Sequence, residues 1–284
     1  MSRIAYVNGC YIDHAHAAVS IEDRGFQFAD SIYEVIAVIN GRLIDADDHL
    51  DRLDRSLEAI RLANPLPRTA LLVIFQQVIR QNRLQNGNLY LQITRGVAHR
   101  AFYFPTEAHP CVVVTARAFD QSAFLRSQGE GVKTITVPDT RWKQPYIKST
   151  ALLASVLAKQ QAVEAGAYEA IFVNDQGYIT EGSSANLWIV NASGVIQTHP
   201  EGQAILSGIT RSRLLSLCQQ ANLPVLEKPF TVKELYQAKE AFLSASNSYV
   251  MPIIMVDQHN IGDGKTGTVT STLQNLYMQF VLKK

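Results

Sequence analysis

The sequence has neither an excess of one charge sign nor a long apolar run. Its 26 basic and 25 acidic residues leave a formal net charge of +1, whereas a sequence-independent nucleic-acid binder needs a basic surplus. No apolar run reaches the roughly 18 residues of a membrane-spanning helix, and the N-terminus has no apolar signal core. We therefore expect a cytoplasmic protein that binds neither nucleic acid nor membrane.

Cysteine and clustered histidine are also scarce. The three cysteines, Cys10, Cys111 and Cys218, are widely separated and odd in number, which does not suit a disulfide framework or a structural zinc site. We expect them to be small buried thiols. The seven histidines are scattered and form no paired metal-binding motif, so the sequence predicts no metal.

Familiar phosphate, dinucleotide and hydrolase motifs are missing or incomplete. Gly264-Lys265-Thr266 resembles the end of a phosphate-binding P-loop, but His259 stands where the motif requires its first glycine. We expect a tight turn there; a non-catalytic phosphate- or nucleotide-binding protein built on it is the alternative from another class. No G-x-G-x-x-G opens a helix, and no G-x-S-x-G forms a nucleophile elbow.

The composition, 47% hydrophobic and 18% charged, can form a substantial core. Hairpin, helix and strand signals alternate along the chain, which predicts an α/β (α+β) protein with many hairpins. The length suits two domains, and we interpret the polar segment 119–129 as a linker between an N-terminal domain, 1–118, and a C-terminal domain, 130–284. The expected helices span 48–62, 69–83, 149–165, 210–221 and 270–281, with another from Thr231; the expected strands span 4–7, 10–12, 31–39, 42–44, 88–94, 111–116, 132–137, 168–173, 178–181, 187–190, 241–244 and 253–256.

Lys148 is the first candidate for chemistry. It lies between apolar residues in the segment 145–153, and we expect a helix directly after it with Ser149 or Thr150 as its cap. Apolar surroundings near a helix N-terminus lower the pKa of an amine, which would make Lys148 a nucleophile able to form a Schiff base. A surface lysine at a helix start is the commoner interpretation of such a stretch.

Glu181 is the second candidate. The stretch 177–187 places this carboxylate at the end of a hairpin strand, and small residues, among them Gly182, Ser183 and Ser184, follow it. Small residues let backbone N–H groups and hydroxyls approach a ligand closely. A plain Gly/Ser turn is the alternative interpretation.

Together, Lys148 and the "E-G-x-x-x-N" context of Glu181 strongly resemble the fold-type IV pyridoxal-phosphate enzymes. This family includes the D-amino acid aminotransferases, the branched-chain aminotransferases and aminodeoxychorismate lyase. The resemblance implies a two-domain fold, with a small N-terminal α/β domain and a larger C-terminal domain that contains a pseudo-barrel of strands. It also implies pyridoxal 5′-phosphate as the cofactor.

Further segments match the same family in order along the chain. Residues 21–35 resemble its "D-R-G-x-x-F-x-D-x-x-Y-E" segment, 49–53 its "H-x-x-R-L" segment, and 206–211 its "G-I-T-R" turn, while 243–248 occupies the place of a second phosphate loop. By this resemblance Lys148 holds the cofactor as a Schiff base and later moves the α-proton, and Glu181 faces the pyridine nitrogen. The remaining implied cofactor ligands are Arg52, Ile209, Thr210, Ser246 and Asn247 at the phosphate, with Ser183 and Ser184 nearby.

The substrate carboxylate site distinguishes the subfamilies. Residues 94–100 match the "T-R-G-x-x-x-R" pattern of D-amino acid aminotransferases, in which the last arginine comes from the partner subunit. The resemblance therefore implies substrate binding by Arg100, Tyr33 and His49. One departure is Phe102, which replaces the histidine of the familiar D-enzymes; a phenyl ring cannot donate the hydrogen bond, a loss of about 1.5–3 kcal/mol for a charged acceptor.

We expect a homodimeric aminotransferase with shared active sites. It would move the amino group of a D-amino acid, such as D-alanine or D-glutamate, to a 2-oxo acid, such as pyruvate or 2-oxoglutarate. A branched-chain L-amino acid aminotransferase or an aminodeoxychorismate lyase is the alternative, because the same cofactor site serves all three.

Overall fold

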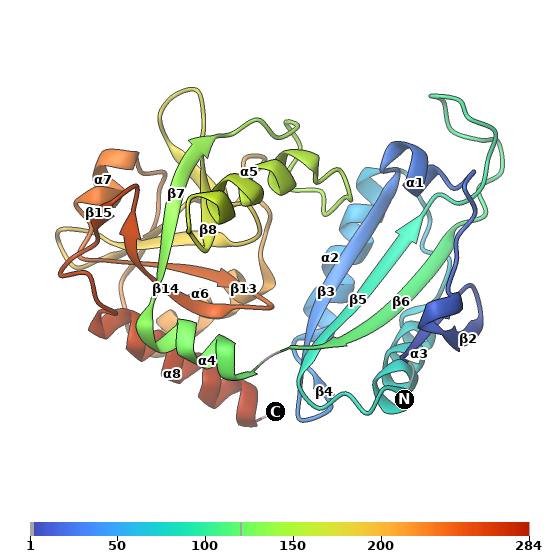
Figure 1. Cartoon of the computed structure of the whole chain (residues 1–284), viewed down its shortest axis with the longest axis horizontal. Coiled ribbons are helices and arrows are strands. Elements are labelled where there is room, and N and C mark those ends of the chain that lie inside the picture. The colour runs from blue at the N-terminus through green and yellow to red at the C-terminus, as the bar shows by residue number, and fades with distance from the viewer. Residues whose placement is uncertain (1–2, 120, 284) are drawn as a thin grey trace. The chain divides into compact units, whose positions relative to one another are not determined.

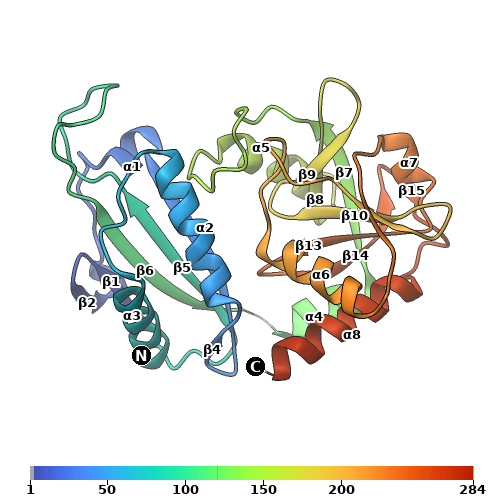
Figure 2. The same ribbon diagram turned by 180° about the vertical axis from the view of Figure 1, so that it is seen from behind.

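The computed structural model describes residues 3–119 and 121–283. They form two compact units (Figures 1 and 2). The first unit comprises the residues up to Phe119 together with Ile147–Ala151, and the second comprises the other described residues. The domain boundaries at 118 and 130 stay a prediction. None of the described helices is both long and apolar enough to cross a membrane.

The first unit is built on a six-stranded antiparallel sheet in the order β2-β1-β6-β5-β3-β4. Two of its hairpins have Asn-Gly turns, and the φ angles are positive at Asn8 and Gly9 (46° and 94°) and at Asn40 and Gly41 (51° and 73°). Positive φ at both central residues suits the twist of paired strands. The strands expected at 4–7 and 10–12, and at 31–39 and 42–44, are confirmed and pair as two hairpins. The strands are β1 (Ile4–Val7), β2 (Cys10–Asp13), β3 (Ser31–Ile39), β4 (Arg42–Leu43), β5 (Gly87–Thr94) and β6 (Cys111–Ala118).

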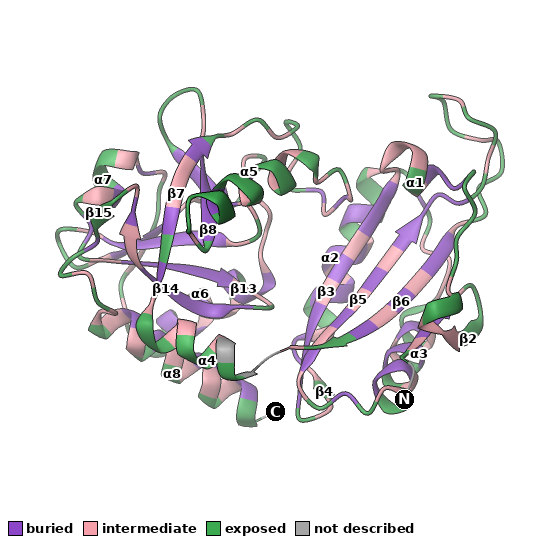
Figure 3. Cartoon of the chain, in the orientation of Figure 1, coloured by how far each residue is buried: buried purple, intermediate pink, exposed green. Residues whose placement is uncertain are grey.

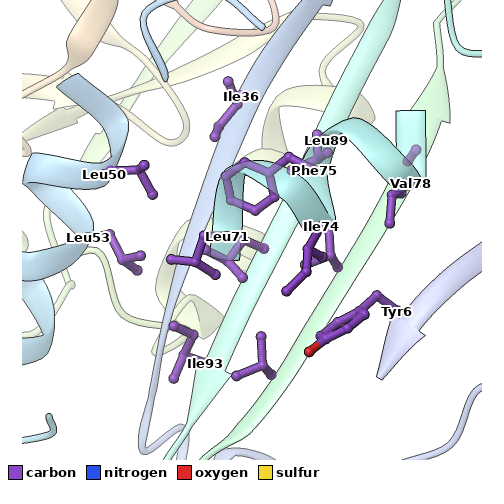
Figure 4. Close-up of a cluster of buried hydrophobic side chains, with 14 of the residues drawn as sticks. Tyr6, Ile36, Leu50, Leu53, Leu71, Ile74, Phe75, Val78, Leu89 and Ile93 are labelled. Carbon is purple, nitrogen blue, oxygen red and sulfur yellow. The ribbon is translucent and has the colours of Figure 1, made fainter. Parts of the chain in front are cut away.

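Helices α2 (Ala46–Ala59) and α3 (Arg68–Gln81) cover one face of this sheet (Figures 1 and 2). Their buried side chains recur every three or four residues, as expected for a helix that packs on one side. Figure 4 shows Leu50 and Leu53 of α2 with Leu71, Phe75 and Val78 of α3 in the core. The unit also contains the short helices η1 (His14–His16) and α1 (Arg24–Phe28).

The second unit contains a nine-stranded mixed sheet in the order β12-β11-β10-β13-β14-β7-β8-β9, with β15 paired to β14. Strand β7 is parallel to both β14 and β8. The sheet curls on itself (Figure 1), so the predicted pseudo-barrel and the mixed α/β class are confirmed. The strands are β7 (Val132–Pro138), β8 (Glu169–Val173), β9 (Ile179–Gly182), β10 (Asn186–Val190), β11 (Ile196–Thr198), β12 (Val225–Glu227), β13 (Glu240–Ala245), β14 (Tyr249–Val256) and β15 (His259–Asn260).

The helices of the second unit are α4 (Gln121–Glu130), α5 (Leu153–Glu164), α6 (Ile209–Gln220), α7 (Val232–Tyr236) and α8 (Thr268–Lys283). The helix expected from Thr231 is confirmed, and it begins with a capping box, since Thr231 and Glu234 each accept a hydrogen bond from the other's backbone N–H. Helix α4 lies in the segment that we interpret as a linker, and whether this helix links two domains stays a prediction. The Phe124 ring packs edge-on against Tyr249, with the ring centroids 5.1 Å apart, and this contact stabilises the helix.

The helix after Lys148 begins later than expected, at Leu153 instead of residue 149. Ser149 and Thr150 are not caps, because their backbones pair with β3: Ser149 forms a bridge with Ile32, and the Thr150 N–H donates to the Ser31 carbonyl over 3.2 Å. A strand-like pairing partner far away in the sequence thus overrides the local helix signal.

The tight turn expected at Gly264 is confirmed, since its N–H donates to the carbonyl of Ile261. The helix N-terminus that follows, that of α8, is occupied by the Glu240 carboxylate, which accepts from the N–H groups of Val269 (3.0 Å) and Thr270 (2.7 Å). A carboxylate in this position uses the donors that a phosphate would need. The alternative of a phosphate-binding protein built on this turn therefore loses its support.

The cysteine prediction is partly wrong. Cys111 and Cys218 are buried as expected, but Cys10 is exposed, and all three are free thiols. Cys10 lies directly after the turn of the first hairpin, on edge strand β2, where one side of the chain faces solvent.

Candidate active site

Lys148 is held by its backbone against strand β3 of the first unit. The N–H of Tyr33 donates to the Lys148 carbonyl over 3.0 Å, and the N–H of Lys148 donates to Ser56 Oγ on α2 over 3.3 Å. The preceding Ile147 is buried in the core of the unit. Because the N–H and the carbonyl of Lys148 are both hydrogen-bonded, its backbone has a fixed position beside strand β3.

The Lys148 ammonium lies over the ring of Tyr33, with Nζ 4.3 Å from the ring centroid. Tyr33 in turn stacks on Tyr90 of β5, at 5.8 Å between centroids. Burial, together with the neighbouring Tyr33, raises the pKa of Tyr90 to about 12. The Tyr90 hydroxyl donates to Gln92 over 2.8 Å. Sequence reasoning missed Tyr90 and Gln92; the period-2 pattern of β5, opposite β3, could have placed them beside Tyr33.

Glu34, His49 and Arg52 form a buried ionic cluster in the same unit. The Arg52 guanidinium donates to both oxygens of Glu34, from Nε over 2.8 Å and from Nη2 over 2.7 Å, and His49 Nδ1 lies 2.7 Å from Glu34 Oε2. Although burial favours the neutral acid, Arg52 and His49 hold the pKa of Glu34 well below its usual range. Burial also lowers the pKa of His49, despite its bond to Glu34. The sequence predicted His49 at the substrate and Arg52 at the phosphate, and it missed Glu34, their common partner.

Arg100 belongs to a different group of side chains, on the loop between β5 and β6. Its guanidinium carbon lies 5.1 Å from the ring centroid of Phe28 at the end of α1. Phe102, the residue in place of the usual histidine, also packs on Phe28, at 5.5 Å between centroids, and is 87% exposed. The side chains of Arg100 and Phe102 thus both pack against the ring of Phe28.

In the second unit, Glu181 is a buried carboxylate with three donor groups around it. Arg141 Nη1 donates to Oε1, Asn186 Nδ2 donates to Oε2 over 3.0 Å, and the N–H of Leu206 is 3.1 and 3.2 Å from the two oxygens. Burial raises the pKa of Glu181, and Arg141 opposes the rise. Asn186 is the asparagine of the E-G-x-x-x-N context, so the motif brings together two residues that contact each other.

Arg141 is a site residue that sequence reasoning missed. It links Glu181 to Asp139, to which its Nε and Nη2 donate over 2.9 and 2.7 Å, and its guanidinium lies over the Phe172 ring. Asp139 also accepts from the Thr180 hydroxyl over 2.8 Å. These bonds hold the pKa of Asp139 below its usual value although burial opposes this. The position of Arg141 in the irregular stretch between β7 and Lys148 gave no pattern from which to predict the contact.

The predicted phosphate donors lie at the N-terminus of α6 and in the turn after β13. Helix α6 begins at Ile209 and Thr210, and no side chain caps it. A Cβ at the preceding Gly208 would collide with Asn186 Oδ1, so only glycine lets the helix start approach β10. Ser246 and Asn247 lie in the turn that joins β13 to β14, where the N–H of Ser248 donates to the Ala245 carbonyl.

These features fit a phosphorylated pyridine cofactor. The uncapped end of a twelve-residue helix offers N–H groups and a favourable dipole to a phosphate. Glu181 offers a carboxylate to a ring nitrogen, and Asn186 links the two, since its Nδ2 bonds to Glu181 and its Oδ1 lies against Gly208.

Ser183 and Ser184 point elsewhere. The Ser183 and Ser184 hydroxyls each donate to the buried carboxylate of Glu169 on β8, the latter over 2.6 Å. In this arrangement the two hydroxyls shape the turn between β9 and β10 that carries Glu181 and Asn186.

Residues 31–256 match the family described as amino-transferase class IV, and the chain belongs to this family. The predicted fold-type IV family is thereby confirmed, and the enzymes of this family use pyridoxal 5′-phosphate. Over 277 residues the chain is 37% identical to a D-alanine aminotransferase of Staphylococcus haemolyticus, with 97% of each chain covered. It is 38% identical over 277 residues to a D-alanine aminotransferase of Bacillus licheniformis, which covers 98% of this chain and 96% of the relative.

Solved structures show the same fold. The branched-chain amino acid aminotransferase of Escherichia coli superposes with a TM-score of 0.91 at 23% identity, over 98% of this chain and 94% of that one. The branched-chain aminotransferase of the thermophilic archaeon Thermoproteus uzoniensis, solved with norvaline, superposes with a TM-score of 0.87 at 28% identity, over 100% of this chain and 96% of that one.

Proposed function

We propose that this protein is a pyridoxal-phosphate aminotransferase that exchanges the amino group of a D-amino acid, such as D-alanine or D-glutamate, with a 2-oxo acid. The observation that carries the proposal is the near-full-length identity of 37–38% to D-alanine aminotransferases. The segment 94–100, which matches the T-R-G-x-x-x-R pattern of D-amino acid aminotransferases and ends at Arg100, supports it. The free thiols of Cys10, Cys111 and Cys218 support a cytoplasmic location.

Lys148 and Glu181 would hold the two ends of the reactive ring. Pyridoxal phosphate supplies the electron sink that accepts the pair left when the α-proton departs. Lys148 would provide the amine that holds the cofactor aldehyde, and its Nζ would carry the proton to and from the substrate α-carbon. The fixed Lys148 backbone and the Tyr33 ring beneath Nζ keep this amine in place. Glu181 would bind the ring nitrogen as a carboxylate, and its hydrogen bond from Arg141 would stabilise that carboxylate against the cost of burial.

The phosphate would be bound by one cation and several neutral donors. The N-terminus of α6 contributes the N–H groups of Ile209 and Thr210, and the β13–β14 turn contributes Ser246 and Asn247. Arg52 contributes the charge. Glu34 fixes the plane of its guanidinium through two hydrogen bonds, and this orientation matters because a planar fork binds phosphate oxygens in only a few geometries.

The substrate carboxylate would be bound by Arg100 of one subunit and Tyr33 of the other, in a homodimer. His49, which bonds to Glu34, would act at the edge of this site. Exposed apolar residues support the contact with a second copy: Leu153, Val156 and Leu157 form a stripe on α5, and Figure 3 shows exposed residues along this helix. Residues three and four apart lie on one helix face, so the stripe is continuous.

An absorption measurement tests the proposal. The purified protein, after addition of pyridoxal phosphate, should show the band of a lysine-linked cofactor near the violet edge of the visible, and Lys148→Ala should abolish it. D-alanine should bleach the band, whereas L-alanine and L-leucine should not. Bleaching by L-leucine alone would favour the second candidate, a branched-chain L-aminotransferase, which the structural similarity to such enzymes makes the one to compare. Failure to form the band would refute the cofactor assignment altogether.

A further inference from the structure

The loop that carries Arg100 is attached to the first unit by an unusual buried charge group. Arg24 and Arg95 both donate from Nε to the same oxygen of Asp30, Oδ2, each over 2.8 Å. The two arginine side chains are 3% exposed and the Asp30 side chain is 10% exposed. Two guanidinium groups therefore share one carboxylate where water is largely excluded.

Each arginine of this pair also donates hydrogen bonds to backbone carbonyls. Arg24 Nη1 donates to the carbonyl of Ala101, the residue directly after Arg100, over 2.6 Å. The N–H of Arg24 donates to the carbonyl of Gly96 over 2.9 Å. Arg24 thus fixes the loop on both sides of Arg100.

Arg95 ties the base of the same loop to the end of α2. Its Nη2 donates to the carbonyl of Ile60 over 2.7 Å and its Nη1 to the carbonyl of Arg61 over 3.3 Å. Its guanidinium lies 3.7 Å from the ring centroid of Phe104. The segment 95–104, which we name the Arg100 loop, is therefore held at Gly96, Ala101 and Phe104.

The Arg100 side chain packs against the ring of Phe28. Its ring centroid lies 4.8 Å from the Arg24 guanidinium and 5.1 Å from that of Arg100, and the Phe102 ring packs on it as well. A cation over an aromatic face is attracted by the ring quadrupole. The ring therefore restricts where the Arg100 guanidinium can lie.

We infer that Arg24, Asp30 and Phe28 are positioning residues for Arg100, and so for recognition of the substrate carboxylate. The inference rests on the proposed function, in which Arg100 binds that carboxylate. A merely structural role explains the group poorly, because well-packed apolar residues stabilise a buried position at least as well as ions do. Charged groups that bond to the loop backbone on both sides of one arginine instead fix a geometry.

The test compares Arg24→Met and Phe28→Leu with Arg55→Met, which removes an exposed arginine of α2. In steady-state assays with pyridoxal phosphate bound, we expect KM for D-alanine to rise roughly tenfold or more in both variants, as for the loss of a charge-assisted contact, with kcat little changed. Single-turnover bleaching by D-alaninamide, which lacks the carboxylate charge, should match the wild type. Hydrogen exchange of the peptide 96–104 should be faster in both variants and unchanged in Arg55→Met.

The two substrates separate positioning from general damage. If D-alanine and D-alaninamide lose equally, or if KM and exchange match those of Arg55→Met, the positioning role is refuted. Should Arg24→Met fail to fold, Phe28→Leu leaves the ionic group intact and decides the question alone. If the wild-type enzyme does not convert D-alanine, the proposed function fails, and hydrogen exchange of 96–104 then decides by itself whether these residues hold the loop.

Discussion

The buried cluster of Glu34, His49 and Arg52 gives a prediction with a definite sign and size. Replacing Glu34 by Gln leaves the Arg52 guanidinium buried, without the carboxylate that accepts two of its hydrogen bonds. Breaking a buried ion pair from one side costs about 3–5 kcal/mol. We therefore expect Glu34→Gln to lower the unfolding temperature of the cofactor-free protein by roughly 10 °C, taking about 2–4 °C per kcal/mol for a protein of this size.

A double-mutant cycle tests the cause of this loss. The double variant Glu34→Gln with Arg52→Met removes both charges of the pair, so neither partner is left as an unpaired buried charge. Its loss of stability should therefore be smaller than the sum of the losses of the two single variants. Thermal unfolding followed by circular dichroism measures all four proteins. Additive effects would refute the reasoning, because they would mean that the Glu34–Arg52 contact has no net coupling.

The same cluster predicts how stability depends on pH. The Glu34 pKa is lowered in the folded protein, so its contribution is present above the unfolded pKa of about 4.5 and is lost as the pH falls toward the folded value. The His49 pKa is also lowered, so protonation of the unfolded chain below about 6.5 favours unfolding. The difference in stability between the wild type and Glu34→Gln should therefore shrink as the pH is lowered through the acid range.

Three further changes have expected outcomes. Glu181→Gln should lower kcat by about 100-fold or more, as for loss of a group that sets a protonation state. The cofactor-free protein should lose less stability than in Glu34→Gln, because Arg141 keeps its ion pair with Asp139; thermal unfolding and kinetics measured together check this. Gly208→Ala should weaken cofactor binding in equilibrium dialysis, since the added Cβ would collide with Asn186 and move the start of α6. Phe102→His restores a donor and should lower KM for D-alanine by up to about tenfold; an unchanged or higher KM would show that packing on Phe28 matters more.

Local patterns predicted the parts of the fold that are decided locally. The Asn-Gly turns and the capping box at Thr231 were predictable because each places a few adjacent residues in a geometry that their own chemistry favours. The start of α5 and the helix α4 were not predictable from local patterns. The backbone of Ser149 pairs with strand β3, and the ring of Tyr249 packs against Phe124 of α4. In both contacts the two partners are far apart in the sequence.

The candidate site shows the same division. Lys148 and Glu181 stand in motifs that a single sequence displays, and Asn186 contacts Glu181 because a tight turn brings them together. Glu34 and Arg141 have no such signal. Their importance lies in hydrogen bonds to residues 18 and 40 positions away, which only the folded chain creates.

Those two unpredicted residues have a common physical role in the two units. Glu34 pairs with the cation proposed to bind phosphate, and Arg141 pairs with the carboxylate proposed to bind the ring nitrogen. A buried charge without a partner would either be neutralised or destabilise the fold. The burial that raises the pKa of Glu181 and the bonds that lower the pKa of Glu34 show both sides of this balance. By pairing each group in advance, the chain can keep ionised side chains in a dry site and hold them in the orientation that catalysis requires.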